Sequence, residues 1–427
     1  MSQENYNFDT LSIHAGYEPD PQTGARNLPI YASTAFAFKD TDHAQKLFAL
    51  DEIGFIYSRL TNPTTNALQT KVAALEKGVF STAFSSGHAA ETACMFALMD
   101  GGKEIVAGRQ LYGGSINLFG NSFKKFGWKT VFADCTKPEK IKAAINENTR
   151  VIFIESIANP GGVFVDIEKI AKIANEAGVV LVVDNTLATP YLIKPFDYGA
   201  HVVIHSMTKF MVGNGTALGG IVVDSGTFDF TNNDKYPNLS QPSPDYHGTV
   251  FAEKFGNLSL SLYLHAVGLR DLGACLSPFN AWLINNGLET LSLRMERHSS
   301  NALAVAKYLK QHPKVVWVSY PGLPDDEYHN LQQKYSPKGA GSVFSFGISG
   351  GDESGIKLVN SVKLFSHVAN LGDIRSLIIH PSTTTHSQLS SQQKEESGAA
   401  PDTLRVSIGL EDIEDIISDL DQALSQI

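Results

Sequence analysis

The chain has 427 residues, of which 43% are hydrophobic and 18% charged, so it is large and apolar enough for two or three folded domains. Its net charge of −10 argues against a nucleic-acid partner, which requires a basic surface. The longest purely aliphatic run, Val179–Val183, is far shorter than the ~20 residues of a membrane-spanning helix. We therefore expect a protein without a membrane or nucleic-acid partner.

The cysteines predict a reducing environment. Cys94, Cys135 and Cys275 are too widely spaced for a disulfide framework or a zinc motif, and no other pattern indicates a metal site. The N-terminus is polar and has no apolar signal core. These features favour a cytoplasmic protein with reduced thiols.

The first 60 residues are proline-rich and aperiodic, which predicts an N-terminal arm. From residue 61 to about 223, short apolar runs alternate with helical patterns, which is typical of a doubly wound α/β domain. The runs are apolar on both faces, as in a mostly parallel sheet covered by helices on each side. The expected strands are 81–84, 105–107, 151–154, 179–183, 202–204 and 221–223, and the expected helices are 67–77, 89–99 and 167–177.

The remaining chain predicts a long loop and a second domain. Residues 224–257 lack periodicity and indicate a loop insertion. Helical and strand patterns are then mixed, which favours a smaller α+β domain. These expected elements are helices 279–293 and 302–311, strands 315–318, 342–346 and 404–408, and a last helix over 413–424. The predicted division is an arm at 1–60, a large α/β domain at 61–280 and a C-terminal domain at 281–427.

An acid and a lysine follow two neighbouring predicted strands. Asp184 ends the run at 179–183, and Lys209 lies just after the run at 202–204, in the segment Ser206-Met207-Thr208-Lys209. The carboxyl ends of parallel strands form the ligand-binding edge of such a sheet. A lysine there can form a Schiff base with pyridoxal phosphate, while a carboxylate keeps the ring nitrogen protonated. An ordinary ion pair at a sheet edge would also place an acid and a lysine at these positions. Further motifs are therefore needed to distinguish a cofactor site from an ion pair.

Two motifs fit the phosphate of that cofactor. Ser85-Ser86-Gly87-His88-Ala89-Ala90 follows a predicted strand and opens a helix, where free backbone N–H groups bind anions. An ordinary strand-to-helix turn has the same pattern. In Tyr57-Ser58-Arg59, the guanidinium can bind two phosphate oxygens and the phenol can add a hydrogen bond, although a surface arginine in a loop is equally compatible.

Three further residues fit one pocket. Tyr112 follows a predicted strand and offers an aromatic plane for a pyridine ring, or it is a packed turn residue. Asn159 lies just past the run at 151–154, at the same sheet edge. Arg405 alternates with core-facing neighbours, so it could bind a substrate carboxylate or lie on an exposed sheet face.

With these residues in view, the chain resembles the pyridoxal-phosphate enzymes of cysteine and methionine metabolism, and within them the sulfhydrylases of O-acetylhomoserine. The resemblance extends over nearly the whole length. It rests on Ala15–Asp20, Tyr57–Arg59, Ser86–Gly87, Tyr112–Gly114, Asp184–Thr186, Ser206–Lys209, Pro244–Gly248, Leu291–His298, His380–His386 and Leu404–Gly409. It implies the fold-type I architecture, with a mostly parallel sheet domain and a smaller C-terminal domain.

The resemblance also implies a role for each site residue. Lys209 would carry the cofactor and act as base, Asp184 would hold the ring nitrogen, and Tyr112 would stack on the ring. The phosphate would be bound by Ser86, Gly87, the backbone of His88, Ser206 and Thr208, and by Tyr57 and Arg59 of a neighbouring subunit, which implies a homodimer and favours a homotetramer. The substrate carboxylate would be held by Asn159, Ser376 and Arg405. Tyr57 or Tyr112 could assist proton transfer at the γ-substituent.

The implied reaction converts O-acetyl-L-homoserine and sulfide into L-homocysteine and acetate, a step of methionine biosynthesis. A methionine γ-lyase or a cystathionine γ-synthase is the alternative within the family, since all three share the same cofactor chemistry. A nicotinamide-dependent dehydrogenase is disfavoured, because the stretch Gly213–Gly219 has Leu218 in place of the third glycine and precedes a strand. A binding protein without activity is the remaining alternative, and it would have no reason to hold the cofactor covalently.

Overall fold

The computed structural model describes residues 6–99, 103–159, 161–385, 387, 390 and 398–427. His386, which ends one of the motifs above, and the polar residues 1–5 lie outside this part of the chain. Among the described residues, no helix has both the length and the apolar character required to cross a membrane.

The larger of two main sheets has seven strands in the order β1-β9-β8-β7-β4-β2-β3. All pairs are parallel except the two that β9 makes with β1 and β8, which confirms the mostly parallel sheet. The link from β8 to β9 contains no helix, so the chain returns antiparallel instead of crossing over. The strands are β1 (Phe80–Phe84), β2 (Glu104–Gly108), β3 (Lys129–Ala133), β4 (Thr149–Glu155), β7 (Val180–Asp184), β8 (Val202–Ser206) and β9 (Gly220–Asp224).

Helices cover both faces of this sheet because its side chains alternate between two cores. In β7, Leu181 and Val183 pack into the core that holds α3 (Pro63–Glu76) and α7 (Ile167–Ala177). Val180 and Val182 face the other core, which holds α4 (Gly87–Leu98) and α11 (Ser259–Tyr263). This burial on both faces explains why the strands are apolar throughout rather than alternating in polarity.

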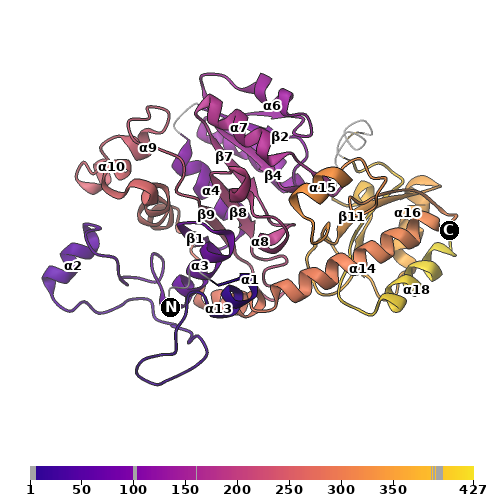
Figure 1. Cartoon of the computed structure of the whole chain (residues 1–427), viewed down its shortest axis with the longest axis horizontal. Coiled ribbons are helices and arrows are strands. Elements are labelled where there is room, and N and C mark those ends of the chain that lie inside the picture. The colour runs from indigo at the N-terminus through magenta and orange to yellow at the C-terminus, as the bar shows by residue number, and fades with distance from the viewer. Residues whose placement is uncertain (1–5, 100–102, 160, 386, 388–389, 391–397) are drawn as a thin grey trace.

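The smaller sheet has five strands in the order β10-β11-β14-β13-β12 and confirms a separate α+β part near the C-terminus. Figure 1 shows α14 running from beneath the large sheet to this second sheet, while α2 lies apart from the body at the opposite end. The strands are β10 (Val315–Ser319), β11 (Val343–Ile348), β12 (Ser366–His367), β13 (Leu377–Ile379) and β14 (Thr403–Ser407), and the main helices beside them are α14 (Leu291–Gln311), α15 (His329–Tyr335), α16 (Gly351–Ser361) and α18 (Ile413–Leu424).

The predicted helices at 279–293 and 302–311 are wrong in their bounds. The structure instead has α13 (Pro278–Leu288) and the continuous α14. The apolar pattern of α14 is interrupted because its buried face carries polar residues: the His298 ring contacts Ile408 O at 2.7 Å and Asn301 donates to Gly409 O at 3.1 Å. Since α13 packs on α3, we propose that the smaller domain begins at α14 rather than at residue 281.

The arm and the insertion contain more structure than the sequence predicts. The arm includes α1 (Phe8–His14) and α2 (Thr41–Phe48), and the insertion includes α9 (Pro237–Ser240) and α10 (Phe251–Phe255). Tyr236 fixes the insertion to the large sheet, because its hydroxyl donates to Arg150 O at 2.6 Å and accepts from Val180 N at 2.9 Å. Other short α-helices and strands are α5 (Gly113–Asn117), α6 (Pro138–Ala144), α8 (Thr189–Leu192), α12 (Arg270–Leu272), β5 (Ile157–Ala158) and β6 (Val163–Phe164).

Candidate active site

A cavity of about 240 Å³ lies where the carboxyl ends of the large sheet's strands meet the smaller sheet. It brings together most of the residues that the sequence singles out. Its lining includes Ser86, Gly87, His88, Glu91, Tyr112, Glu155, Asn159, Asp184, Ser206, Thr208, Lys209, Asn370 and Arg405. The position agrees with the general location of ligand sites in open α/β sheets.

Asp184 is the last residue of β7, and its side chain reaches the cavity. Burial raises its pKa, while the hydrogen bond from Thr186 N to Oδ1, 2.9 Å long, opposes that rise. A carboxylate in so poorly solvated a position is stabilised by a cationic partner. A protonated pyridine nitrogen would be such a partner, so this side chain fits the role expected of it.

Lys209 lies in the turn that follows β8, with its amine in the same cavity. Burial, and secondly the positive charge of Arg405, lower the pKa of its amine to about 8. Its Nζ donates to Asn370 Oδ1 at 2.5 Å. A lysine with a lowered pKa is neutral often enough at physiological pH to condense with an aldehyde.

The N-terminus of α4 forms the expected cradle for a phosphate. Ser86 caps the helix by accepting from Ala89 N at 3.1 Å, and Gly87 and His88, the first two residues of the helix, line the cavity. The hydroxyl residues Ser206 and Thr208 line the same space. Gly87 is required here, because a Cβ on it would lie 2.8 Å from Ser206 Cβ. This arrangement of donors fits a phosphate group.

Tyr112 presents an aromatic plane to the cavity. Its side chain is 50% exposed, and its ring centroid lies 5.7 Å from that of His88. A Cβ on Gly114 would lie 2.4 Å from Tyr112 Cε1 and 2.8 Å from His88 Cε1, so that glycine makes room for both rings. The available face is compatible with stacking on a pyridine ring.

Arg405 projects from β14 into the cavity from the side of the smaller sheet. Its guanidinium donates from Nη1 to Asn159 Oδ1 at 3.2 Å and from Nη2 to the carbonyl oxygen of Asn370 at 2.9 Å. Burial lowers the pKa of this group to about 10, which leaves it protonated at neutral pH. A buried, oriented guanidinium of this kind is suited to binding the carboxylate of an amino acid.

The structure does not bring Ser376 to this cavity. Its hydroxyl donates to Glu411 Oε2 at 3.0 Å and accepts from Gly409 N at 2.9 Å, so it joins two segments of the smaller domain. Asn370 occupies the position beside Arg405 and Lys209 instead. The nearest sequence feature that could have indicated this contact is the glycine at position 372. In the structure its φ is +76°, and a Cβ on it would lie 3.0 Å from Lys209 Cβ.

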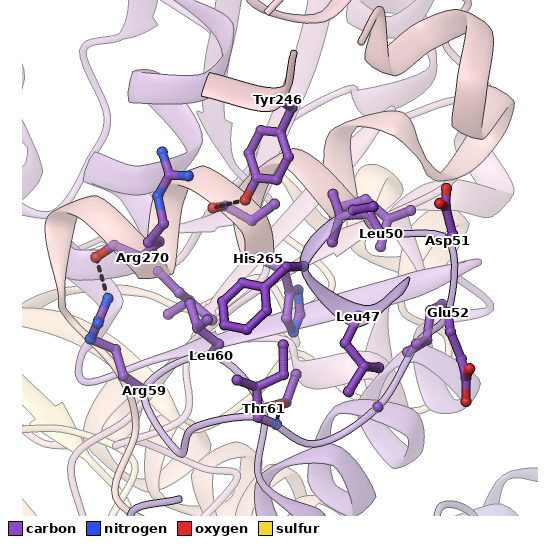
Figure 2. Close-up of a pocket in the computed structure, with 18 of the residues that line it drawn as sticks. Leu47, Leu50, Asp51, Glu52, Arg59, Leu60, Thr61, Tyr246, His265 and Arg270 are labelled. Atoms are coloured by element: carbon purple, nitrogen blue, oxygen red, sulfur yellow. Dashed lines mark hydrogen bonds between the residues drawn. The ribbon is translucent and has the colours of Figure 1, made fainter. Parts of the chain in front are cut away.

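Tyr57 and Arg59 lie outside the lining of the cavity that holds Lys209. Tyr57 is 43% exposed, and Arg59 borders a second, larger cavity of about 720 Å³ between the arm and the body of the chain. Figure 2 shows that Arg59 donates to the carbonyl oxygen of Arg270, below Tyr246 of the insertion. Neither Lys209 nor Asp184 lines this second cavity, so we assign the chemistry to the smaller one.

Comparisons with known proteins agree with this geometry. The sequence profile of the family described as "Cys/Met metabolism PLP-dependent enzyme" matches residues 9–425. The chain is 46% identical to the O-acetyl-L-homoserine sulfhydrylase of Leptospira meyeri, over 99% of this chain and 98% of that protein. It is 47% identical to the homocysteine synthase of Schizosaccharomyces pombe, over 99% of both chains.

A solved structure is similar over nearly the whole chain. It is a putative O-acetylhomoserine (thiol)-lyase from Campylobacter jejuni, with a TM-score of 0.96 and 40% identity, and the match covers 98% of this chain and 100% of that one. The crystal of that protein contains a lysine joined to the pyridoxyl phosphate group.

Proposed function

The chain belongs to the pyridoxal-phosphate-dependent enzymes of cysteine and methionine metabolism, and on this premise we propose that it catalyses γ-replacement on O-acetyl-L-homoserine. Sulfide replaces acetate, and the product is L-homocysteine. The names of the relatives support this substrate pair. The observation that carries the proposal is that Lys209, Asp184 and Arg405 line one cavity.

Pyridoxal 5′-phosphate supplies, when bound, an electron sink for the pair released when the substrate loses its Cα proton. We propose that Asp184 holds the ring nitrogen and that Tyr112 packs on the ring. Ser86, Gly87, the backbone of His88, Ser206 and Thr208 would bind the phosphate. The donor types along the cavity support this assignment.

We propose that Lys209 is both the attachment point of the cofactor and the base. Its amine, with a pKa of about 8, would take the proton from Cα and return one later. Arg405 and Asn159 would orient the α-carboxylate. Of the two tyrosines considered for proton transfer at the γ-oxygen of the substrate, only Tyr112 lines the cavity of its own chain. We therefore propose Tyr112 for this role.

We also propose that the active form is a homo-oligomer, at least a dimer and in our interpretation a dimer of dimers. Tyr57 and Arg59 lie away from the cavity of their own chain and would complete the phosphate site of a second copy. The arm also exposes apolar side chains, with Phe48 62% and Ile53 76% exposed.

We further propose a cytoplasmic location. The free thiols Cys94 and Cys135 are buried, which supports this proposal.

A product assay tests the proposed reaction. The purified holoenzyme should form homocysteine from O-acetylhomoserine and sulfide, as measured by mass spectrometry. Methionine alone, and cysteine with O-succinylhomoserine, serve as the γ-lyase and cystathionine γ-synthase arms. Faster conversion in either of these arms would replace the proposed reaction with the corresponding alternative.

A further inference from the structure

Glu155, the last residue of β4, connects two loops of the active site. Its Oε1 accepts from the backbone N–H of Tyr112 at 2.5 Å, and its Oε2 accepts from the backbone N–H of Asn159 at 3.1 Å. The side chain is buried, with 3% of the residue exposed, and it lines the cavity that holds Lys209. One carboxyl group therefore ties together the loop after β2, which contains Tyr112, and the loop after β5, which begins at Asn159.

The two loops serve different parts of the site. Tyr112 contributes the aromatic plane, and Asn159 accepts from the guanidinium of Arg405 at 3.2 Å. The connection through Glu155 thus extends from the ring-stacking residue to the carboxylate-binding arginine. A shift of Glu155 would move both groups relative to each other.

Burial beside another acid makes this position energetically unfavourable for a carboxylate. Its presence there indicates that the two hydrogen bonds to backbone N–H groups have a role. Glu155 lies directly beside Asp184 in the register of β4 and β7. Burial and the charge of Asp184 raise its pKa well above the usual range, while the two backbone N–H groups oppose that rise. An amide could not replace it, since a glutamine has one acceptor oxygen and would turn an N–H donor toward the other backbone N–H.

We propose that Glu155 is a positioning residue that sets the orientation of Tyr112 relative to Arg405, and so couples cofactor seating to substrate-carboxylate binding. The inference rests on the proposed function, which assigns the ring to Tyr112 and the carboxylate to Arg405. Glu155 itself does not need to touch a reacting atom. Its role is to hold two loops in one register, which a well-packed active site requires.

The test compares Glu155→Gln with the matched control Glu104→Gln. Glu104 is also 3% exposed, accepts from Asn146 Nδ2 at 2.6 Å and lies at the opposite, amino end of the neighbouring strand β2. Both variants remove a buried carboxyl from the same sheet. The melting temperatures of the two variants measure the loss of stability of the fold. Effects on the active site can then be distinguished from this general loss of stability.

The dissociation constant of pyridoxal 5′-phosphate, titrated into cofactor-free protein, should rise about tenfold in Glu155→Gln, because one of the two buried hydrogen bonds that fix the loops is lost. The visible circular dichroism of the bound cofactor should change as well, and the KM for O-acetylhomoserine should rise more than kcat falls. Glu104→Gln should leave all three values as in the wild type.

Asn159→Ala removes the contact with Arg405 and leaves the connection of Glu155 to Tyr112 intact. It therefore provides a second test if Glu155→Gln does not fold. It should raise KM while leaving the affinity for pyridoxal 5′-phosphate unchanged. Wild-type cofactor affinity, dichroism and KM in Glu155→Gln would overturn the inference, and so would an unchanged KM in Asn159→Ala. A wild-type enzyme without γ-replacement activity would instead contradict the proposed function, because the cofactor titration does not depend on that reaction.

Discussion

Lys209 and Asn370 are 161 positions apart in the sequence, yet Lys209 Nζ donates to Asn370 Oδ1 at 2.5 Å. The backbone carbonyl of Asn370 accepts from Arg405 at 2.9 Å. One residue of the smaller domain thus contacts both the lysine assigned as the base and the arginine assigned to the substrate carboxylate. The pairing supports our proposal that the active site lies between the two proposed domains.

Asn370→Ala should raise the KM for O-acetylhomoserine by about tenfold, because the cavity loses the side-chain amide that accepts from Lys209. The backbone carbonyl that accepts from Arg405 is retained in this variant. Ser376→Ala should leave KM near the wild-type value and lower the melting temperature, since its bonds to Glu411 and Gly409 are structural. Steady-state kinetics and thermal unfolding of both variants provide the measurement. The opposite pattern would restore Ser376 to the carboxylate site.

Lys209→Ala should abolish turnover and the visible absorbance of the bound cofactor together, because the amine is the proposed attachment point and base. Lys172→Ala, at an exposed position of α7, is the control and should retain both. Absorbance spectra and product formation are the two measurements. Turnover or a wild-type spectrum in Lys209→Ala would exclude the assignment.

Capture of pyridoxal 5′-phosphate by the cofactor-free protein should depend on pH with a midpoint near 8. Only the neutral amine attacks an aldehyde, and burial together with Arg405 lowers the pKa of Lys209 from 10.5 to about 8. Capture is therefore slow below pH 8 and reaches its plateau above it. Stopped-flow absorbance between pH 6.5 and 9.5 follows the rate.

Arg405→Met should shift that midpoint upward, since removing the cation lets Lys209 hold its proton to higher pH. A midpoint above pH 10 in the wild-type protein would show that the amine is not desolvated. A midpoint that falls in Arg405→Met would contradict the electrostatic part of the explanation.

Arg405→Lys should raise the KM for O-acetylhomoserine by about thirtyfold or more and reduce kcat less, because lysine cannot reproduce the oriented fork beside Asn159 and the Asn370 carbonyl. Since the charge is retained, a large effect would demonstrate that geometry matters as well as charge. An unchanged KM would remove Arg405 from the substrate site.

Gly220→Ala should destabilise the fold by about 1–3 kcal/mol and weaken cofactor binding. A Cβ at this position of β9 would lie 1.9 Å from the carbonyl oxygen of Ser86, at the start of α4. Gly113→Ala is the matched control, because its Cβ would meet nothing within 4 Å. Urea unfolding and cofactor titration of the two variants measure the effects, and equal stability of both would contradict the steric argument.

The local sequence determined six of the seven strands of the large sheet and the ends that carry the chemistry. It did not predict β3, an edge strand that is only partly buried and so lacks a continuous apolar run. Apolar β-branched runs, glycine stops and the Ser86 cap are signals within a few residues, so Asp184, Lys209 and the α4 N-terminus could be placed from them. The resemblance to a known family added the cofactor and the roles.

Only the tertiary structure decided that Asn370, rather than Ser376, lies beside Arg405, that β9 runs antiparallel, and that Glu155 joins the loops of Tyr112 and Asn159. It also decided that α14 is continuous through a polar buried stretch. Local periodicity reports which face of an element is buried, but not which distant polar group will meet it. Those partners depend on how separate elements of the chain pack together: Tyr112 and Glu155 are 43 positions apart, and Asn370 and Arg405 are 35.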